Sequence, residues 1–390
     1  MNKTDSLRIV FAGGGTGGHI YPGIAVADAL QSLAKSKNVS VQIYWIGNNS
    51  GMDRDIVQKN LVAEGGSISG FFGIPCGKLR RYVSVQNFID VFKIVAGFVK
   101  SIAILVRIKP DCLFSKGGFV SVPPCWAARL LKIPYYTHEC DFTPGLATRL
   151  NARAAKNVLV SYSETASCFS ESVAKRCIVT GNPVRPVFYS DNAEDGFLFL
   201  GLSKNHEKPI LLVLGGSLGA QQINSLIMNN LDWLKERYCV VHQTGKVFAE
   251  EHPDVMAGGD DSYKPYAFIY KEMPAVIQCA DVILSRAGAN SIWESAVSRK
   301  PMVLVPLCGS GTRGDQVDNA RYFEKNKAAV VLAGKDADDV HLRNALEFFL
   351  DAEKRVAYSL ASAALCEGEA PSMKISKIIM DGFNYVAPVN

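Results

Sequence analysis

The chain has 390 residues, which favours two domains, or three small ones, over a single hydrophobic core. Hydrophobic residues make up 48% and charged residues 20%, proportions of a folded globular protein that exclude a collagen-like or disordered chain. The 42 Lys and Arg against 37 Asp and Glu leave a net charge of +5. This bias is too small for a dedicated nucleic-acid-binding protein, so we expect no nucleic-acid partner.

The ten cysteines are widely spaced, and the closest two, Cys168 and Cys177, are nine residues apart. Neither a CxxC redox motif nor a zinc-ribbon spacing is present, so we expect reduced thiols in a cytosolic protein. No apolar run reaches the roughly 18 residues of a membrane-spanning helix, because Lys93 and Lys100 interrupt the longest one, 91–106. We therefore expect no transmembrane segment.

Short runs rich in β-branched residues alternate with helical patterns along the whole chain. Those that we predict as strands are residues 7–12, 41–46, 133–138, 157–161, 209–214, 239–243, 281–285 and 301–306. This alternation is typical of an α/β protein with parallel sheets and helical crossovers.

Twice a predicted strand runs into a glycine cluster that opens a helix, at 13–19 and at 215–220. Each cluster resembles the first strand-to-helix turn of a Rossmann-like domain. Between them, residues 181–196 are rich in Pro, Gly, Asn and acidic residues and lack periodicity, as a linker does. The pattern predicts two Rossmann-like domains with parallel sheets whose glycine loops face one interdomain cleft.

The first cluster matches GxGxxG at Gly13, Gly15 and Gly18, a loop whose bare backbone admits a pyrophosphate. The second strand ends at Asn48 without the acidic residue that binds the ribose of NAD, which disfavours a dehydrogenase. His19 follows the loop where a P-loop would carry Lys, which disfavours an ATPase. A tight turn without a ligand is the simpler alternative.

Two polar positions at strand ends are candidates for proton transfer. His19 is expected in the first turn of a helix, where the dipole keeps the imidazole neutral and able to act as a base. The pair His138 and Glu139 ends another strand, where it could orient a substrate hydroxyl or the base. A structural histidine and a strand end that bonds its own loop are the alternatives, and spacing alone leaves them open.

The second half of the chain carries two further candidate loops. Residues 285–294 follow a strand and open a helix with Glu294, a carboxylate suited to binding both hydroxyls of a ribose. Residues 309–320 supply amides, hydroxyls and Gln316 after the next strand, although a plain surface loop would look similar. Two DxD sequences, at 53–55 and 336–338, stand at helix starts, so we expect helix capping rather than metal binding.

A basic and apolar segment follows residue 71. Lys93, Lys100 and Arg107 recur every seven residues, which places three cations on one stripe of a predicted apolar helix. Such a helix suits an anionic membrane surface, and a buried helix with a solvated lysine stripe is the alternative. The residues predicted to dock on the membrane are Phe71, Phe72, Lys78, Arg80, Arg81, Lys93 and Lys100.

Seven motifs occur together in one order along the chain, at 13–30, 116–123, 138–148, 180–185, 215–220, 285–294 and 313–320. In combination they resemble the MurG family, the peptidoglycan N-acetylglucosaminyltransferases. The resemblance implies a GT-B fold: an acceptor-binding and membrane-docking domain at 1–181, a linker at 182–196 and a UDP-GlcNAc-binding domain at 197–370. A C-terminal segment, 371–390, is expected to pack back on the N-terminal domain.

The resemblance also implies a reaction. GlcNAc would move with inversion from UDP-GlcNAc to the 4-hydroxyl of undecaprenyl-pyrophosphoryl-MurNAc-pentapeptide, lipid I, to give lipid II and UDP. No cofactor or metal is implied. The implied location is peripheral, at the cytoplasmic face of the inner membrane, on an anionic lipid surface where contacts with other cell-wall synthesis proteins are conceivable. A UDP-GlcNAc 2-epimerase or a non-catalytic nucleotide-sugar sensor are the rival interpretations.

Site residues follow from the motifs by resemblance. His19 and Glu139 are the expected catalytic residues. The expected acceptor-binding residues are Gly14, Gly15, Thr16, Phe119 and Asp141. The expected donor-binding residues are Thr16, Gly17, Gly18, Arg185, Ser217, Ile269, Ala289, Asn290, Ser291, Glu294 and Gln316. Among these, Arg185 and Ser217 are expected at the diphosphate, the Ile269 backbone at uracil, Glu294 at the ribose and Gln316 at a GlcNAc hydroxyl.

The chain also departs from the usual family pattern. The family's HEQN becomes 138–141 with Cys140 and Asp141, and the usual Tyr of the GGYVS motif is Phe119. An Asn seven residues beyond HEQN is Thr148, and only one glutamine, Gln316, stands in the last motif. We hypothesise that Asp141 assists proton removal, since it replaces an amide by a charged acceptor.

Overall fold

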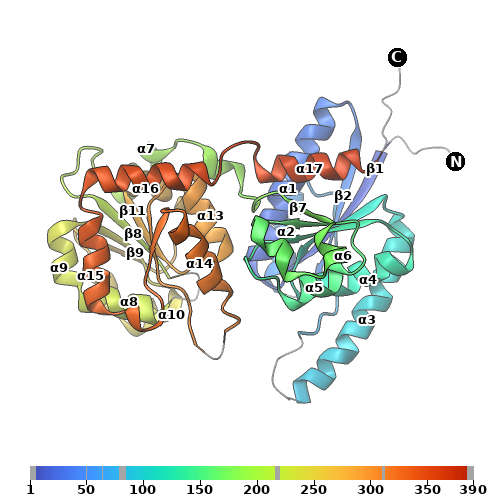
Figure 1. Cartoon of the computed structure of the whole chain (residues 1–390), viewed down its shortest axis with the longest axis horizontal. Coiled ribbons are helices and arrows are strands. Elements are labelled where there is room, and N and C mark those ends of the chain that lie inside the picture. Colours follow the sequence, from blue (N-terminus) through green and yellow to red (C-terminus); the bar gives the residue numbers. More distant parts are fainter. Residues whose placement is uncertain are drawn as a thin grey trace. The chain divides into compact units, whose positions relative to one another are not determined.

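The computed structural model describes residues 6–49, 51–63, 65–78, 85–215, 220–309 and 312–383. The chain forms two compact units, one of Met1–Arg185 with Glu369–Asn390 and one of Pro186–Gly368 (Figure 1). Each unit has its own parallel sheet covered by helices, so the prediction of two α/β domains is confirmed.

The sheet of unit 1 has seven strands in the order β3-β2-β1-β4-β5-β6-β7. Their bounds are β1 (Ser6–Gly13), β2 (Ser40–Asn48), β3 (Gly70–Ile74), β4 (Cys112–Gly117), β5 (Tyr135–Glu139), β6 (Asn157–Val160) and β7 (Cys177–Val179). The predicted strands of this half are confirmed, whereas β3, β4 and β7 were not predicted. β4 carries Ser115 and Lys116 although it is entirely buried, and β7 has only three residues, so neither shows a clear apolar run.

Helices pack on both faces of this sheet. Their bounds are α1 (Gly17–Ser36), α2 (Met52–Val62), α3 (Val85–Ile108), α4 (Val122–Leu130), α5 (Leu146–Ala152), α6 (Glu171–Ala174) and α17 (Pro371–Asp381). Neighbouring strand residues point to opposite sides, so Phe11 belongs to one hydrophobic cluster and Val10 to the other. Each face of the sheet therefore has its own core.

The C-terminal helix α17 belongs to unit 1. Ile375 and Ile379 are fully buried in the same cluster as Phe11, and the Ser376 hydroxyl donates to the carbonyl oxygen of Val26 in α1 at 3.3 Å. Residues 371–381 thus lie on α1, although the two helices stand at opposite ends of the chain (Figure 1).

The sheet of unit 2 has six strands in the order β10-β9-β8-β11-β12-β13. Their bounds are β8 (Ile210–Leu214), β9 (Cys239–Gln243), β10 (Tyr263–Tyr266), β11 (Val282–Ser285), β12 (Met302–Leu304) and β13 (Ala329–Val331). In unit 1 the first strand, β1, lies between β2 and β4, and in unit 2 the first strand, β8, lies between β9 and β11. The strand order therefore reverses at β1 and at β8. Ligands of open parallel sheets bind at the carboxyl ends beside such a reversal.

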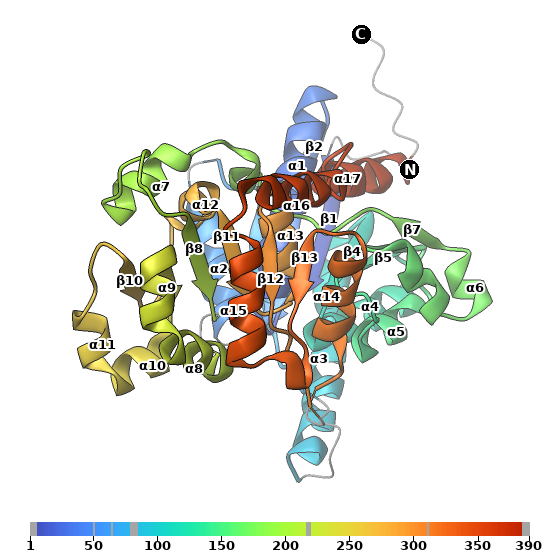
Figure 2. The same cartoon turned by 60° about the vertical axis from the view of Figure 1, so that its left-hand side comes forward.

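The helices of unit 2 surround this sheet (Figure 2). Their bounds are α7 (Ala193–Leu200), α8 (Gln221–Asn229), α9 (Leu231–Arg237), α10 (Lys246–Glu251), α11 (Pro253–Ala257), α12 (Met273–Cys279), α13 (Ala289–Val297), α14 (Asp315–Lys325), α15 (Asp339–Phe348) and α16 (Ala352–Ala364). The expected linker 182–196 includes the start of α7, which packs so closely on α12 that a Cβ on Gly196 would lie 2.3 Å from the Ala275 carbonyl oxygen.

Candidate functional site

The glycine loop of unit 1 joins the end of β1 directly to α1. Gly15 has a φ of 85°, a conformation that glycine adopts without strain, and Thr16 is the N-cap of α1. His19 lies in the first turn, as predicted. The Thr16 hydroxyl lies 2.8 Å from Nδ1 of His19, which fixes the plane of the imidazole. With the proton on Nδ1, Nε2 becomes the basic nitrogen of the ring.

Asp53 connects this loop to the next one. Its carboxylate accepts from the Gly15 amide at 2.8 Å and from the Asn48 amide at 2.9 Å, and the side chain is buried. Burial raises the pKa of Asp53, and the two backbone hydrogen bonds oppose that shift. The prediction that Asp53 caps a helix is wrong, because α2 has no side-chain cap. Asp338 does cap α15, by accepting from the His341 amide at 2.8 Å.

The loop after β4 packs on the glycine loop. A Cβ on Gly15 would lie 2.5 Å from Cε1 of Phe119, so the Phe119 ring covers Gly15. A Cβ on Gly118 would lie 2.8 Å from the Gly14 carbonyl oxygen and 3.2 Å from Cδ2 of His19. The fold therefore brings together Gly14, Gly15, Phe119 and His19, which the sequence assigned to acceptor binding and catalysis from two distant motifs.

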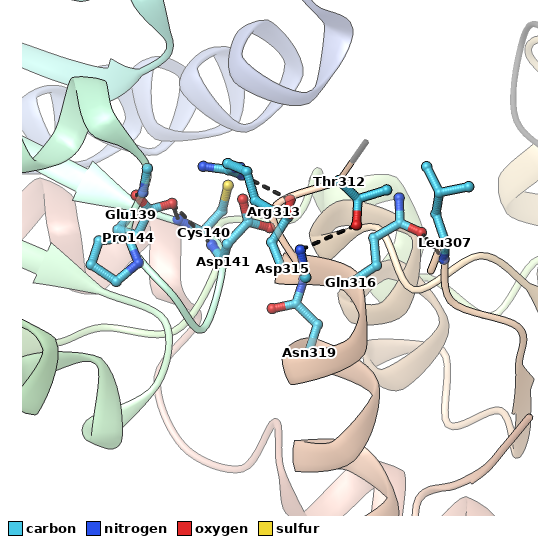
Figure 3. A network of polar contacts seen from close by, with 12 residues as sticks. Glu139, Cys140, Asp141, Pro144, Leu307, Thr312, Arg313, Asp315, Gln316 and Asn319 are labelled. Atoms are coloured by element: carbon cyan, nitrogen blue, oxygen red, sulfur yellow. Dashed lines mark hydrogen bonds and ion pairs between the residues drawn. The ribbon is translucent and has the colours of Figure 1, made fainter. Parts of the chain in front are cut away.

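The carboxylate of Glu139 holds its own loop. It accepts from the amides of Cys140 at 2.9 Å, Asp141 at 3.1 Å and Gly145 at 3.0 Å (Figure 3). These contacts correspond to the alternative in which the strand end bonds its own loop, and a catalytic role of Glu139 stays a prediction. Donor atoms of Glu139, Cys140 and Asp141 lie within 4.8 Å of one another, but burial raises the pKa of Cys140, which keeps the thiol protonated and a weak metal ligand.

Arg185 ends unit 1 and lies on α1. Its guanidinium carbon is 4.9 Å from the centroid of the Tyr21 ring, two residues beyond His19 in the sequence. A cation stacked beside the start of a long helix is suited to a diphosphate, because both the guanidinium and the helix dipole attract negative charge. The contact with the donor that the sequence predicts for Arg185 stays a prediction.

The donor residues of unit 2 follow the carboxyl ends of three strands: Ile269 comes after β10, residues 289–294 open α13 after β11, and Gln316 opens α14 after β12. Ser217 lies outside the described residues. Ile269 is buried, and its amide donates to Oε1 of Gln243 at 3.0 Å. Because the Ile269 amide is occupied in this way, the predicted backbone contact with uracil would use the Ile269 carbonyl oxygen. Gln243 ends β9 and was not predicted as a site residue from the sequence. Its side chain fixes the backbone at Ile269 by accepting from that amide.

Helix α13 starts directly after β11, with Ala289, Asn290 and Ser291 in its first turn and Glu294 in its second, as predicted. Just before it, Arg286 donates to Oε1 of Gln222 at 2.9 Å and to the Val305 carbonyl oxygen at 3.1 Å. Burial lowers the pKa of Arg286, yet guanidinium groups stay protonated in proteins. A fixed cation at a helix start is a second suitable partner for a diphosphate.

Gln316 holds the loop after β12 through one half of its amide. Its Oε1 accepts from the Leu307 amide at 2.8 Å, which directs the remaining donor group to other partners such as a sugar hydroxyl. Arg313 and Asp315 form an ion pair at 2.7 Å beside it (Figure 3). Asn319 donates to the Ala287 carbonyl oxygen at 3.2 Å and so ties α14 to the start of α13.

The predicted docking segment is only partly exposed. Phe71 and Phe72 are half-buried in β3 and pack against opposite cores, and Arg80 and Arg81 lie outside the described residues. Lys78, Lys93 and Lys100 are exposed. The exposed apolar residues come from α3 instead, led by Phe88 at 69%, Phe92 at 62% and Val99 at 60% exposure. Within the described ranges, no helix combines the length and apolarity needed to cross a membrane.

Comparisons with known proteins agree with this geometry. Models of the glycosyltransferase family 28 N-terminal and C-terminal domains match residues 9–160 and 210–375. A Treponema denticola protein is 47% identical, with 96% of this chain and 97% of that protein covered. A Clostridium botulinum protein is 36% identical, with 88% and 91% covered. Both are called UDP-N-acetylglucosamine--N-acetylmuramyl-(pentapeptide) pyrophosphoryl-undecaprenol N-acetylglucosamine transferase.

Solved structures share the fold. MurG from Acinetobacter baumannii matches with a TM-score of 0.71 at 23% identity, covering 97% of this chain and 100% of that one. A UDP-GlcNAc 2-epimerase from Methanocaldococcus jannaschii matches with a TM-score of 0.62 at 14% identity, with the same coverage. The two parallel-sheet units, together with the two matching family models, define a glycosyltransferase of the GT-B class. The chain belongs to glycosyltransferase family 28, and its predicted resemblance to the MurG family is confirmed.

Several residues of these sites escaped prediction from the sequence. Asp53, Gln243 and Arg286 bond segments that follow other strands: their partners Gly15, Ile269 and Val305 are 38, 26 and 19 residues away in sequence. Arg286 stands inside a recognised motif, and Asp53 stands in the DxD sequence 53–55, which was interpreted as a helix cap. No local pattern marks Gln243, because a buried Gln at a strand end has no distinctive spacing.

Proposed function

We propose that this protein transfers GlcNAc from UDP-GlcNAc to the 4-hydroxyl of the MurNAc of undecaprenyl-pyrophosphoryl-MurNAc-pentapeptide, giving lipid II and UDP. The observation that carries the proposal is the 47% identity over nearly the whole of both chains to a transferase of that name. The 2-epimerase alternative is not favoured, since its solved representative is only 14% identical and shares the fold alone.

In this reaction one bond forms as another breaks. The acceptor oxygen attacks C1 of GlcNAc, the C1–oxygen bond to the diphosphate breaks, and its electron pair leaves with UDP. Nε2 of His19 takes the proton of the acceptor hydroxyl, and the Thr16 hydroxyl holds the ring through Nδ1 at 2.8 Å. A positioned base of this kind contributes about 10²- to 10⁴-fold to the rate.

Positive groups offset the charge that grows on the leaving diphosphate. Arg185, Arg286 and the start of α13 are the groups of this chain suited to that task. Glu294 binds the ribose hydroxyls, and the donor half of the Gln316 amide holds a GlcNAc hydroxyl. On the acceptor side, the glycine loop meets the pyrophosphate with amides other than that of Gly15, which Asp53 occupies.

We also propose that the protein works at the cytoplasmic face of the inner membrane as a peripheral protein. The support is the exposed apolar surface of α3, formed by Phe88, Phe92, Val95 and Val99, with exposed Lys93 and Lys100 on the same helix. Apolar side chains insert at the acyl boundary while lysines bind anionic headgroups. This arrangement brings the enzyme to a lipid-linked acceptor.

The test is transfer of labelled GlcNAc from UDP-GlcNAc to a lipid I analogue in detergent without added metal. Wild-type protein is expected to form the disaccharide, His19→Ala to lose at least about 100-fold in kcat while still binding UDP, and Glu294→Ala to bind UDP-GlcNAc more weakly. If the wild type binds UDP-GlcNAc tightly and forms no disaccharide, while releasing UDP without acceptor, an epimerase-like activity replaces the proposal.

A further inference from the structure

Lys116 is buried at the carboxyl end of β4, and the proposed function gives it no role. Lys116 is 1% exposed and precedes the paired glycines whose loop packs on His19. A buried ammonium group is costly unless it is hydrogen-bonded or neutralised, so a lysine in this position calls for a physical reason.

The partners of Lys116 are neutral groups from two other strand ends. Its Nζ lies 3.1 Å from Nδ1 of His138 and 3.5 Å from Oδ1 of Asn182. Nε2 of His138 lies 3.0 Å from the carbonyl oxygen of Gly181, so Nε2 carries the proton and Nδ1 accepts from Lys116. Burial, followed by the charge of Lys116, holds the pKa of His138 well below its usual value, which keeps this imidazole neutral.

The chain of contacts ends on the segment that carries Arg185. Gly181 has a φ of 80°, and a Cβ there would lie 2.8 Å from Pro371, so this turn is tightly enclosed. Asn182 and Val184 are buried. Arg185 follows directly and stacks on Tyr21 at 4.9 Å. Lys116 and His138 therefore hold one end of the segment 181–185 by hydrogen bonds. The other end carries the Arg185 guanidinium, which lies beside the start of α1.

We propose that Lys116 is a positioning residue for diphosphate binding, which acts through His138 and Asn182 on the 181–185 segment and so on Arg185. The inference deepens the proposed function, because it rests on Arg185 binding the diphosphate of the donor. Loss of the ammonium leaves Nδ1 of His138 and Oδ1 of Asn182 without their donor, and the turn at Gly181 loosens. Arg185 then samples orientations that miss the diphosphate.

The experiment is a double-mutant cycle on the full chain, measured by UDP binding in a calorimeter and by kcat/KM for UDP-GlcNAc. The variants are Lys116→Met, which keeps the length of the side chain without charge or donor, Arg185→Met and the double mutant. Lys175→Met is the matched control, because the Lys175 side chain, at the C-cap of α6, is 73% exposed. Melting temperatures report on folding, and Lys116→Leu, which also lacks the charge and the donor, replaces Lys116→Met if the latter does not fold.

If Lys116 acts through Arg185, the two effects are not additive. We expect about a 10-fold loss of UDP affinity for Lys116→Met, about 100-fold for Arg185→Met and again about 100-fold for the double mutant, since coupled residues deviate from additivity by amounts of this order. Lys175→Met is expected to match the wild type. KM for the lipid I analogue is expected to change little.

Three results would overturn the inference: additive losses near 1,000-fold, a loss in Lys116→Met that affects both substrates equally, or normal UDP binding by Arg185→Met. Failure of the proposed function looks different. In that case the wild type makes no disaccharide at all, while the cycle in UDP binding still reports whether Lys116 and Arg185 are coupled.

Discussion

Asp53 shows how a single buried side chain shapes a binding loop. Its two carboxylate oxygens accept from two amides that belong to different loops, those of Gly15 and Asn48. A Cβ on Gly14 would lie 1.8 Å from Oδ2 of Asp53, so glycine is required where the carboxylate approaches the loop. The sequence predicted the glycines and missed the acid that makes them necessary.

Replacing Asp53 by Asn should disturb this loop. The amide keeps one acceptor oxygen and turns a donor towards the second backbone N–H, which leaves at least one buried amide unsatisfied. We expect a loss of about 1–3 kcal/mol in the free energy of unfolding, together with slower GlcNAc transfer. Asp55→Asn is the matched control, since Asp55 lies in the same helix turn and is exposed. Equal unfolding midpoints in urea for the two variants would contradict this role.

His242 makes the stability of unit 2 depend on pH. It is fully buried between Asn224 and Tyr263, at 3.1 Å from each, and burial lowers its pKa to about 3 from 6.5. Between pH 6.5 and pH 3, His242 binds a proton in the unfolded chain but not in the folded chain. The free energy of unfolding is therefore highest above pH 6.5 and falls as the pH decreases towards 3. The slope approaches about 1.4 kcal/mol per pH unit. His138 acts in the same direction.

Urea unfolding at pH 7.5 and pH 5.5 measures this effect. His242→Gln is expected to reduce the difference in unfolding free energy between the two pH values, because glutamine does not titrate. His252→Gln serves as the control, since His252 is exposed. An unchanged pH difference in His242→Gln would show that other groups cause it.

Helix α3 illustrates what a pattern predicts about an element. The seven-residue spacing of Lys93, Lys100 and Arg107 correctly predicts a helix with exposed cations, now observed as Val85–Ile108. The apolar residues next to it were harder to judge. Phe71 and Phe72 belong to strand β3 and pack against its cores, whereas Phe88 and Phe92 are exposed and contact each other edge to face, with ring centroids 5.1 Å apart.

Membrane binding should therefore depend on the exposed residues of α3. We expect the double variant Phe88→Glu with Phe92→Glu to bind phosphatidylglycerol vesicles at least about 100-fold more weakly, because burying each phenylalanine contributes about 1.5–3 kcal/mol. Flotation of vesicles with bound protein measures this. Leu198→Glu is the control, a residue 81% exposed on α7 of unit 2. Equal flotation of both proteins would place the docking surface elsewhere.

For the molecule as a whole, the two units are expected to divide the substrates. UDP-GlcNAc should slow amide exchange at the starts of α13 and α14 and around Ile269, because these segments hold the described donor residues predicted in unit 2. A lipid I analogue should slow exchange in the loop 13–19 and around Phe119 of unit 1. Hydrogen exchange with mass spectrometry measures both. Protection by UDP-GlcNAc confined to unit 1 would contradict this division.

Local sequence was sufficient for features that depend on neighbours along the chain. Apolar runs predicted β1, β2, β5, β6, β8, β9, β11 and β12 and missed β3, β4, β7, β10 and β13. The first glycine loop, His19 and Glu294 lie where strand-to-helix turns place them. The combination of motifs was enough to indicate the family. These signals work because the fold of a parallel sheet sets the ligand-binding turns directly after the strands.

Features that depend on distant partners came only from the folded chain. Asp53 reaches Gly15, Gln243 reaches Ile269 and Lys116 reaches His138, in each case from one strand end to that of a neighbouring strand. Lys116 also reaches Asn182, which follows β7 of the same sheet. The same holds for Phe71, which packs in a core. Glu139 differs, because its partners are in its own loop, which the sequence had left open as an alternative. Burial and hydrogen-bond partners are properties of the packed sheet, so residues of the same type and spacing acquire different roles once strands far apart in sequence become neighbours.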